Sequence, residues 1–266
     1  MTCSSGGYHH AILRLRPHRG GFLTTPAPGA APPPYADGRL HARPDLLRQI
    51  PHQRQPALDC GTHQLAFSDG RKAVLHVPPH LDSGSGAGGQ PLHLLVWLHG
   101  AGGQHGGGDQ LALAHAMRHG ALLLMPEALS TSWDMLRGGF GADLAFLDRA
   151  LLWTMQRYQV DEQAMALAGF SDGASYALSV GLMNGHLFSD ILAFSPGYMA
   201  PLRREGQPRV AVVHGRDDAV LPVHRGHDIA QRLVQEGYAV HYHEFDGAHL
   251  VSPAEARAAL LRLEQR

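Results

Sequence analysis

One serine of the chain sits in a pattern that is typical of a catalytic nucleophile. Gly169-Phe170-Ser171-Asp172-Gly173 fits G-x-S-x-G, and no other stretch of the chain does. In this pattern the serine lies on a sharp strand-to-helix turn, and the two flanking glycines avoid side-chain clashes there. A hydroxyl becomes a good nucleophile only when a base takes its proton. The pattern therefore predicts attack by Ser171 on a carbonyl carbon, with a partner base elsewhere in the chain.

Candidate partners for Ser171 follow two apolar segments near the C-terminus, each predicted as a strand. Asp217 and Asp218 follow the first segment and His249 follows the second. The carboxyl ends of parallel strands meet at one edge of a sheet, where ligands of such sheets bind, so these residues are expected near Ser171. His249 is the predicted base, and a carboxylate is needed to orient it. The spacing alone leaves the choice between Asp217 and Asp218 open.

A glycine-rich run is predicted to stabilise the negative charge that such an attack creates. The run Leu98-His99-Gly100-Ala101-Gly102-Gly103 follows a buried apolar segment. Backbone amides fixed in position stabilise an oxyanion, and glycines let the backbone approach a substrate. The predicted donors are the amides of Ala101 and of Asp172, the residue after the serine.

The runs HGAGG, GFSDG, HGRDDAVLP and FDGAH, in this order, resemble the α/β-hydrolase superfamily. More narrowly, the chain is similar to the phospholipase/carboxylesterase branch, which is related to polyhydroxybutyrate-depolymerase-like esterases. The resemblance begins near Leu92 and implies Ser171 as nucleophile and His249 as base. The family pattern H-G-x-x-D-x-x-x-P implies Asp218, not Asp217, as the acid. Acyl-protein thioesterases of this group usually have Gln at the position of Asp172, and dienelactone hydrolases use a cysteine nucleophile, so neither substrate assignment carries over.

The elements that must position these residues alternate between strand and helix from Thr62 onward, which indicates a parallel sheet covered on both faces. We expect an α/β-hydrolase fold with a mostly parallel sheet and no large cap domain, because the stretch between residues 194 and 209 is too short to fold as one. The predicted strands are 73–77, 93–98, 121–125, 164–169, 190–194, 209–214 and 239–245, and the predicted helices are 109–119, 142–158, 173–183, 224–236 and 253–264.

The N-terminal part of the chain differs in composition from the rest. The run TTPAPGAAPPPYA is rich in proline, which blocks both helix and sheet. We predict a flexible arm over residues 1–60, with a short helix around 44–50, and a catalytic domain over residues 61–266.

The substrate side of the site is predicted from side chains near the motifs. Trp133, Phe170, Tyr198 and Met199 are candidates for substrate binding, whereas Asp134 and Asp143 are expected to be structural hydrogen-bond acceptors. We expect a small-molecule or polymeric carboxylic ester as substrate, of short-chain or polyester type. A thioesterase or peptidase with the same triad, or a binding protein without activity, remain as alternatives.

Composition excludes several other classes of protein. Twenty-two basic against 23 acidic residues give a net charge of -1, which argues against nucleic-acid binding. No apolar run reaches membrane-spanning length, and the two cysteines favour the reducing cytoplasm. The histidine pairs at 115/119, 224/227 and 241/243 lack further metal ligands in sequence, so neither a metal nor another cofactor is expected. Activity is predicted to rise with pH through neutrality, since the base must be a neutral imidazole. The oligomeric state is left open.

Overall fold

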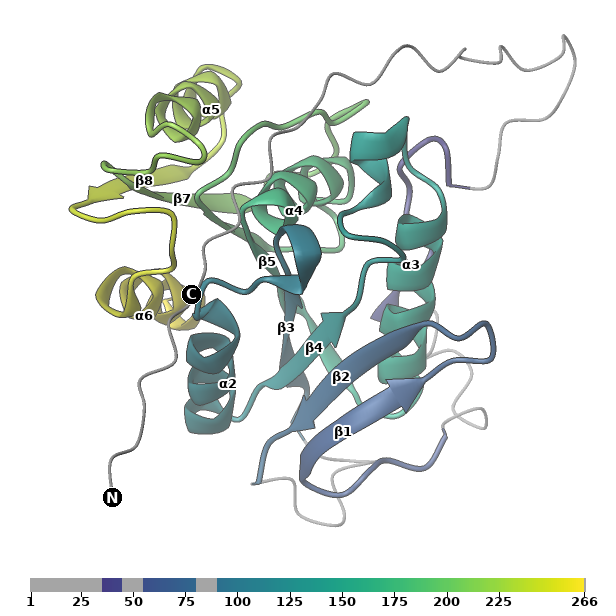
Figure 1. The fold of residues 1–266 in the computed structure, drawn as a ribbon. Helices are drawn as coiled ribbons and strands as arrows, with labels where there is room; N and C mark the ends of the chain where they lie inside the picture. Colours follow the sequence, from purple (N-terminus) through teal and green to yellow (C-terminus); the bar gives the residue numbers. More distant parts are fainter. Residues whose placement is uncertain (1–34, 45–54, 80–89, 266) are drawn as a thin grey trace, which may run out of the picture. The chain divides into compact units, whose positions relative to one another are not determined.

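Eight strands form one sheet in the order β1-β2-β4-β3-β5-β6-β7-β8 (Figure 1). The structure is a computed structural model that describes residues 35–44, 55–79 and 90–265. β1 and β2, and β2 and β4, pair antiparallel, and all other neighbours pair parallel. The strands are β1 Gly61–Ala66, β2 Lys72–Val77, β3 Leu92–Leu98, β4 Leu122–Pro126, β5 Val160–Phe170, β6 Asp190–Phe194, β7 Arg209–Gly215 and β8 Val240–Phe245.

Helices cover both faces of the sheet. Those with bounds in the described residues are α2 Gly108–His119, α3 Ala142–Met155, α4 Asp172–Met183, α5 His224–Gln235 and α6 Pro253–Leu261, with short 3-10 turns at Ala101–Gly103, Asp134–Arg137 and Arg262–Glu264. Buried side chains of α3, α4 and α5 share one hydrophobic cluster with the sheet, and those of α2 and α6 share the other. The central strands are buried on both faces, which is why they appear in the sequence as continuous apolar runs.

The predicted fold class is confirmed, and the differences lie at the edges of the elements. β1 was not predicted, because an edge strand with alternating exposed residues has no continuous apolar run. β5 starts at Val160, whereas the predicted strand starts at residue 164. The prediction missed its first residues because they include the polar run Asp161-Glu162-Gln163. α3 ends at Met155 and not at Tyr158, since the chain turns there into the start of β5. Residues 195–208, between β6 and β7, contain no helix or strand, so no cap domain is inserted at this point.

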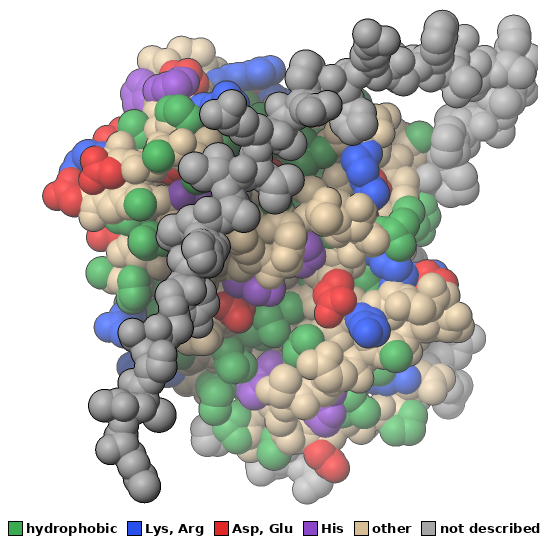
Figure 2. Space-filling view, in the orientation of Figure 1, with side chains coloured by type: hydrophobic (Ala, Val, Ile, Leu, Met, Phe, Trp, Pro, Cys, Tyr) green, Lys and Arg blue, Asp and Glu red, His purple; other side chains and the backbone are tan. Residues whose placement is uncertain are grey.

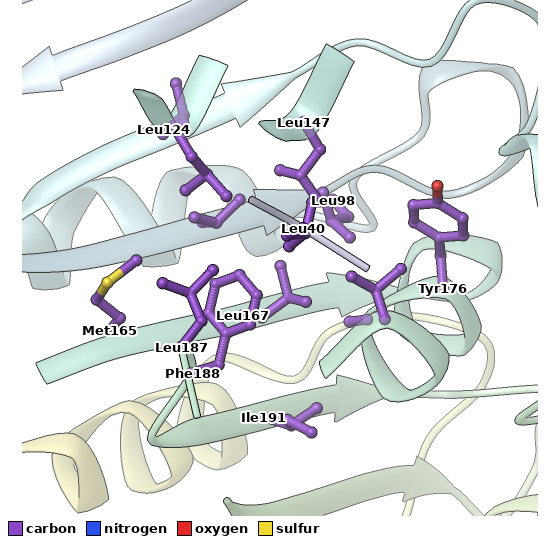
Figure 3. Close-up of a cluster of buried hydrophobic side chains, with 14 of the residues drawn as sticks. Leu40, Leu98, Leu124, Leu147, Met165, Leu167, Tyr176, Leu187, Phe188 and Ile191 are labelled. Carbon is purple, nitrogen blue, oxygen red and sulfur yellow. The ribbon is translucent and has the colours of Figure 1, made fainter. Parts of the chain in front are cut away.

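Leu40 lies in the main hydrophobic cluster although the sequence assigned it to the N-terminal arm. Its side chain is fully buried in the cluster that also contains Leu98 of β3, Leu147 of α3 and Leu167 of β5 (Figure 3). The Leu40 amide donates to Asn184 Oδ1 at 2.9 Å, and Asp148 Oδ1 accepts from the next two amides at 2.7 Å each. Residues 35–44 therefore pack as part of the compact unit that spans Pro33–Arg266. The rest of the predicted arm and helix, at 1–34 and 45–54, lies outside the described residues.

The surface shows no large area of a single charge on the face drawn in Figure 2, where basic and acidic side chains are interspersed. Within the described residues, no helix combines the length and the apolar composition that a membrane crossing requires.

Candidate active site

Ser171 lies at the turn between β5 and α4 in a strained backbone conformation. Its φ is 56° and its ψ is -116°, a region that costs a residue other than glycine about 1–3 kcal/mol. The turn is closed on one side because the Ser171 amide donates to the Phe194 carbonyl at 2.9 Å. A β-carbon on Gly169 would lie 2.4 Å from the Gly173 carbonyl oxygen, so this sharp turn requires glycine. The local sequence thus presents the serine at the carboxyl end of the sheet.

His249 contacts both Ser171 and Asp218. Its Nε2 atom lies 2.9 Å from Ser171 Oγ, and its Nδ1 atom lies 2.6 Å from Asp218 Oδ2. Because a carboxylate only accepts hydrogen bonds, Nδ1 carries the proton and Nε2 is free to accept one from the serine. This order of serine, imidazole and carboxylate is the one that nucleophilic catalysis requires.

Asp218 is fully enclosed, whereas its neighbour Asp217 is exposed. The Oδ1 atom of Asp218 accepts hydrogen bonds from the amides of Val220 and Leu221 at 2.9 and 2.8 Å. Burial alone would raise the pKa of Asp218, but the bond from His249 and these two amides outweigh it and hold that pKa below its ordinary value. The carboxylate therefore stays charged beside the imidazole.

Backbone bonds tie together the three loops that meet at this site. The Asp217 amide donates to the Gly247 carbonyl at 2.9 Å, which joins the loop after β7 to the loop after β8. The Val251 amide donates to the Gly106 carbonyl at 3.1 Å, which joins the loop of His249 to the glycine-rich loop after β3. The distances around His249 are therefore set by a connected backbone framework and not by its side chain alone.

The glycine-rich loop after β3 lies directly against Ser171. A β-carbon on Gly100 would be 3.2 Å from the Ser171 β-carbon, so the absence of a side chain allows this approach. Within the described residues, neither the Ala101 amide nor the Asp172 amide has a hydrogen-bond acceptor. Both are therefore available to a ligand beside Ser171, and the Asp172 amide also lies at the N-terminus of α4, where the helix dipole favours negative charge.

The stretch that follows β4 is held by two buried aspartates. Asp134 Oδ2 accepts from the amides of Gly141 and Asp143 at 2.9 and 2.7 Å, and its Oδ1 accepts from the Tyr176 hydroxyl at 3.0 Å. The Asp143 carboxylate, fully buried, accepts from Arg71 at 2.7 Å. Both side chains act as structural acceptors in the structure, and they fix the stretch that borders the glycine-rich loop.

Two of the residues predicted to bind substrate are too buried for that role. Trp133 is 1% exposed, stacks on Tyr176 and donates from Nε1 to the His99 carbonyl at 2.9 Å. Phe170 is 2% exposed, and its ring lies against the His249 ring at a centroid distance of 4.7 Å. Neither side chain has the exposed surface that a substrate contact needs: the indole supports the glycine-rich loop from behind, and the phenyl ring backs the imidazole.

Tyr198 and Met199 are partly buried and remain candidates for substrate binding. The Tyr198 amide lies 3.4 Å from the Oγ atom of Ser175, and Ser175 lies one helical turn after Ser171 on α4. Burial and the nearby Asp172 charge both raise the pKa of the Tyr198 hydroxyl, so it stays protonated and can donate a hydrogen bond. Met199 packs against the main hydrophobic cluster.

Two serines that support the site were not identified from the sequence. Ser175 Oγ donates to the Ser171 carbonyl at 3.1 Å and accepts from the Gly197 amide at 3.0 Å, which fixes the segment after β6. Ser132 Oγ donates to Asp172 Oδ2 at 2.7 Å. The only signal for Ser175 is its place one helical turn after Ser171, and nothing in the sequence points to Ser132.

The histidine pairs of the sequence fall outside this site. The His115 and His119 rings lie in contact, tilted by 30° with centroids 4.4 Å apart, and Glu264 lies 3.3 Å from His115 and 3.9 Å from His119. The rings of His241 and His243, both on β8, lie parallel to each other with centroids 6.4 Å apart. In the parts of the chain that the structure describes, no group of three or more such side chains is arranged to hold a metal ion.

Comparisons with known proteins agree with the fold. Residues 148–263, less than half of the chain, match the model of the phospholipase/carboxylesterase family. The chain is also similar to a probable feruloyl esterase C of Aspergillus niger, with 26% identity over 189 residues, 68% of this chain and 66% of that protein. The chain thus spans just under two thirds of the length of that curated relative.

Solved structures show the same architecture. The chain matches a thermostable esterase with a TM-score of 0.61 and 19% identity, over 78% of this chain and 63% of that one. It matches a ferulic acid esterase from Anaeromyces mucronatus with a TM-score of 0.55 and 15% identity, over 79% of this chain and 93% of that one. At these identities the likeness establishes the fold. With the sheet order, it establishes an α/β-hydrolase fold for the chain.

Proposed function

We propose that the chain hydrolyses carboxylic esters through a Ser171-His249-Asp218 triad and an acyl-enzyme. The observation that carries this proposal is the position of His249, within 2.9 Å of Ser171 Oγ and 2.6 Å of Asp218 Oδ2. A histidine placed between a strained, glycine-flanked serine and a buried carboxylate can take the serine proton and bear the resulting charge.

The reaction then follows from the atoms in the site. Ser171 Oγ attacks the ester carbonyl carbon while His249 Nε2 takes the hydroxyl proton. The carbonyl oxygen becomes an anion that the Ala101 and Asp172 amides stabilise. When the carbon–oxygen bond to the alcohol breaks, Nε2 returns the proton to the alcohol, which leaves. Water repeats the same steps on the acyl-enzyme, releases the acid and restores Ser171.

The substrate class is inferred from the absence of a cap between β6 and β7 and from the relatives. Because residues 195–208 form no cap, the site can accept a small ester or the end of a polymer chain, in line with a short-chain or polyester substrate. The relatives favour one acyl group within this class, because both a curated relative and a solved structure are named for ferulic acid esters. Tyr198 and Met199 are the proposed contacts for the acyl group.

The test compares wild type with Ser171→Ala on p-nitrophenyl esters from acetate to decanoate and on methyl ferulate. We expect hydrolysis by wild type and none above background by the variant, with the best chain length or ferulate defining the acyl pocket. A fluorophosphonate label should attach to wild type and not to Ser171→Ala. Wild type that neither hydrolyses any ester nor takes the label would refute the proposed function.

The alternative activities are separated by matched substrates. A thioesterase or a peptidase would show a higher kcat/KM on a thioester or an amide than on the ester with the same acyl group. A protein that neither takes the fluorophosphonate label nor turns over any of the three would be a binding protein on a hydrolase fold, whereas label without turnover would indicate a hydrolase of another substrate. We further propose a cytoplasmic location, on the low number of cysteines alone.

A further inference from the structure

A second histidine, His214, lies against the carboxylate of the proposed triad. It is the sixth residue of β7 and its side chain is fully buried. Its Nε2 atom lies 2.8 Å from the Leu221 carbonyl oxygen and 3.3 Å from Asp218 Oδ2. Both neighbours are acceptors, so Nε2 must carry a proton.

The surroundings of the Nδ1 atom fix the protonation state of His214. Its Nδ1 atom is buried and has no hydrogen-bond partner in the described part of the chain. A β-carbon on Gly226 of α5 would lie only 2.5 Å from Nδ1, so the helix backbone closes this side of the ring. Burial lowers the pKa of His214, against the opposing effects of Leu221 and Asp218, while the nearby His249 lowers it further. The ring is thus a neutral donor with a single proton on Nε2.

We propose that His214 is a positioning residue for the triad: its Nε2–H holds the Leu221 carbonyl and faces Asp218 Oδ2, which sets the carboxylate for His249. The proposal rests on the proposed function and extends it by one residue. The turn from β7 folds back so that Leu221 gives its amide to Asp218 Oδ1 and its carbonyl to His214. One imidazole therefore links both ends of this turn, and it adds a fourth neighbour to the carboxylate beside two amides and His249.

The proposal makes an electrostatic prediction in addition to a geometric one. The partial positive charge of Nε2–H opposes part of the negative charge on Asp218. Without it, Asp218 would hold the protonated form of His249 more strongly, and the acid limb of the kcat/KM profile would move to higher pH. A residue that merely filled space would not move this limb.

The test measures p-nitrophenyl acetate hydrolysis from about pH 5 to about pH 9 by wild type, His214→Leu and His214→Gln. Leucine fills the space without a donor, whereas glutamine keeps an N–H at the end of its side chain. We expect His214→Leu to lose roughly ten- to a hundredfold in kcat/KM and to move the acid limb upward, and His214→Gln to regain most of both. An unmoved acid limb in His214→Leu, or the same defect in both variants, would overturn the proposal.

A second measurement on wild type covers the case in which a variant does not fold. In ¹⁵N-histidine NMR, His214 should show a protonated Nε2 and a bare Nδ1 throughout the same pH range. Titration of His214 in that range, or a proton on Nδ1, would also overturn the proposal. This spectrum needs no turnover, so it separates a failure of the His214 proposal from a failure of the ester hydrolase proposal.

Discussion

The backbone of Gly173 packs against the carbonyl oxygen of Leu98, the last residue of β3, so closely that a β-carbon on Gly173 would lie 2.2 Å from that oxygen. The first turn of α4 thus rests directly on the strand that leads into the glycine-rich loop. This contact sets the spacing between Ser171 and the amide of Ala101, because both residues lie within three positions of it. The glycines of the motif therefore allow two close contacts: Gly169 permits the sharp turn at Ser171, and Gly173 permits the packing of α4 on the end of β3.

Gly173→Ala is expected to destabilise the fold and to abolish activity. The added methyl group cannot fit without moving either α4 or β3, at a cost of about 3 kcal/mol in the free energy of unfolding. Urea unfolding of the variant measures this cost. Gly141→Ala is the matched control, because its added β-carbon would lie 4.0 Å from the nearest atom, the Asp134 carboxylate. Equal stability of the two variants would contradict the close contact at Gly173.

Asp218→Asn is expected to lower kcat by about a thousandfold or more, because an amide in place of the carboxylate favours the wrong tautomer of His249. Asp217→Asn is the control, since the Asp217 side chain is exposed and only the backbone amide of this residue donates a hydrogen bond in this region. Its kcat should stay within about twofold of wild type. Steady-state kinetics on the best p-nitrophenyl ester decides the question. A larger loss of kcat in Asp217→Asn than in Asp218→Asn would mean that Asp217 is the acid and that the proposed triad is wrong.

Leu40→Ala tests whether residues 35–44 contribute to the stability of the catalytic domain. The side chain is fully buried, so the cavity and the lost apolar contact should cost about 3 kcal/mol. Leu202→Ala removes the same atoms from a side chain that is 63% exposed, and should change stability by less than about 0.5 kcal/mol. Both values come from urea unfolding. Similar costs for the two variants would mean that Leu40 does not anchor this segment in solution.

The sequence predicted the central sheet well because burial on both faces leaves continuous apolar runs in β3 to β7. It also named the serine and the histidine that the structure brings together, because glycine spacing and strand ends leave clear marks, whereas the choice of Asp218 over Asp217 came only from the family resemblance. It failed where the side chain's surroundings decide its role. Trp133 and Phe170 have the composition of a binding pocket, but both face the interior. His214 lies within a motif that was used only for its aspartate, and nothing in the sequence shows which atoms its ring contacts.

Acid should destabilise the protein through His115, whose pKa burial lowers to about 4. His119 and His93 lower it further, and Glu264 opposes them. The unfolded chain binds a proton near pH 6.5, whereas the folded one does so only near pH 4. This contribution to stability is therefore complete above about pH 6.5 and is lost as the pH falls toward about 4.

The loss through His115 should reach about 3 kcal/mol in the free energy of unfolding at the acid end of that range. His115→Leu removes the titrating group from α2, so its free energy of unfolding should fall less between about pH 7 and about pH 4 than that of wild type. His227→Leu is the control, because that side chain is exposed on α5 and should keep the acid sensitivity of wild type. Urea unfolding at several pH values gives both slopes. If wild type and His115→Leu lost stability in parallel, the acid sensitivity would have to arise at other groups, because a buried neutral imidazole must be protonated on unfolding in this range.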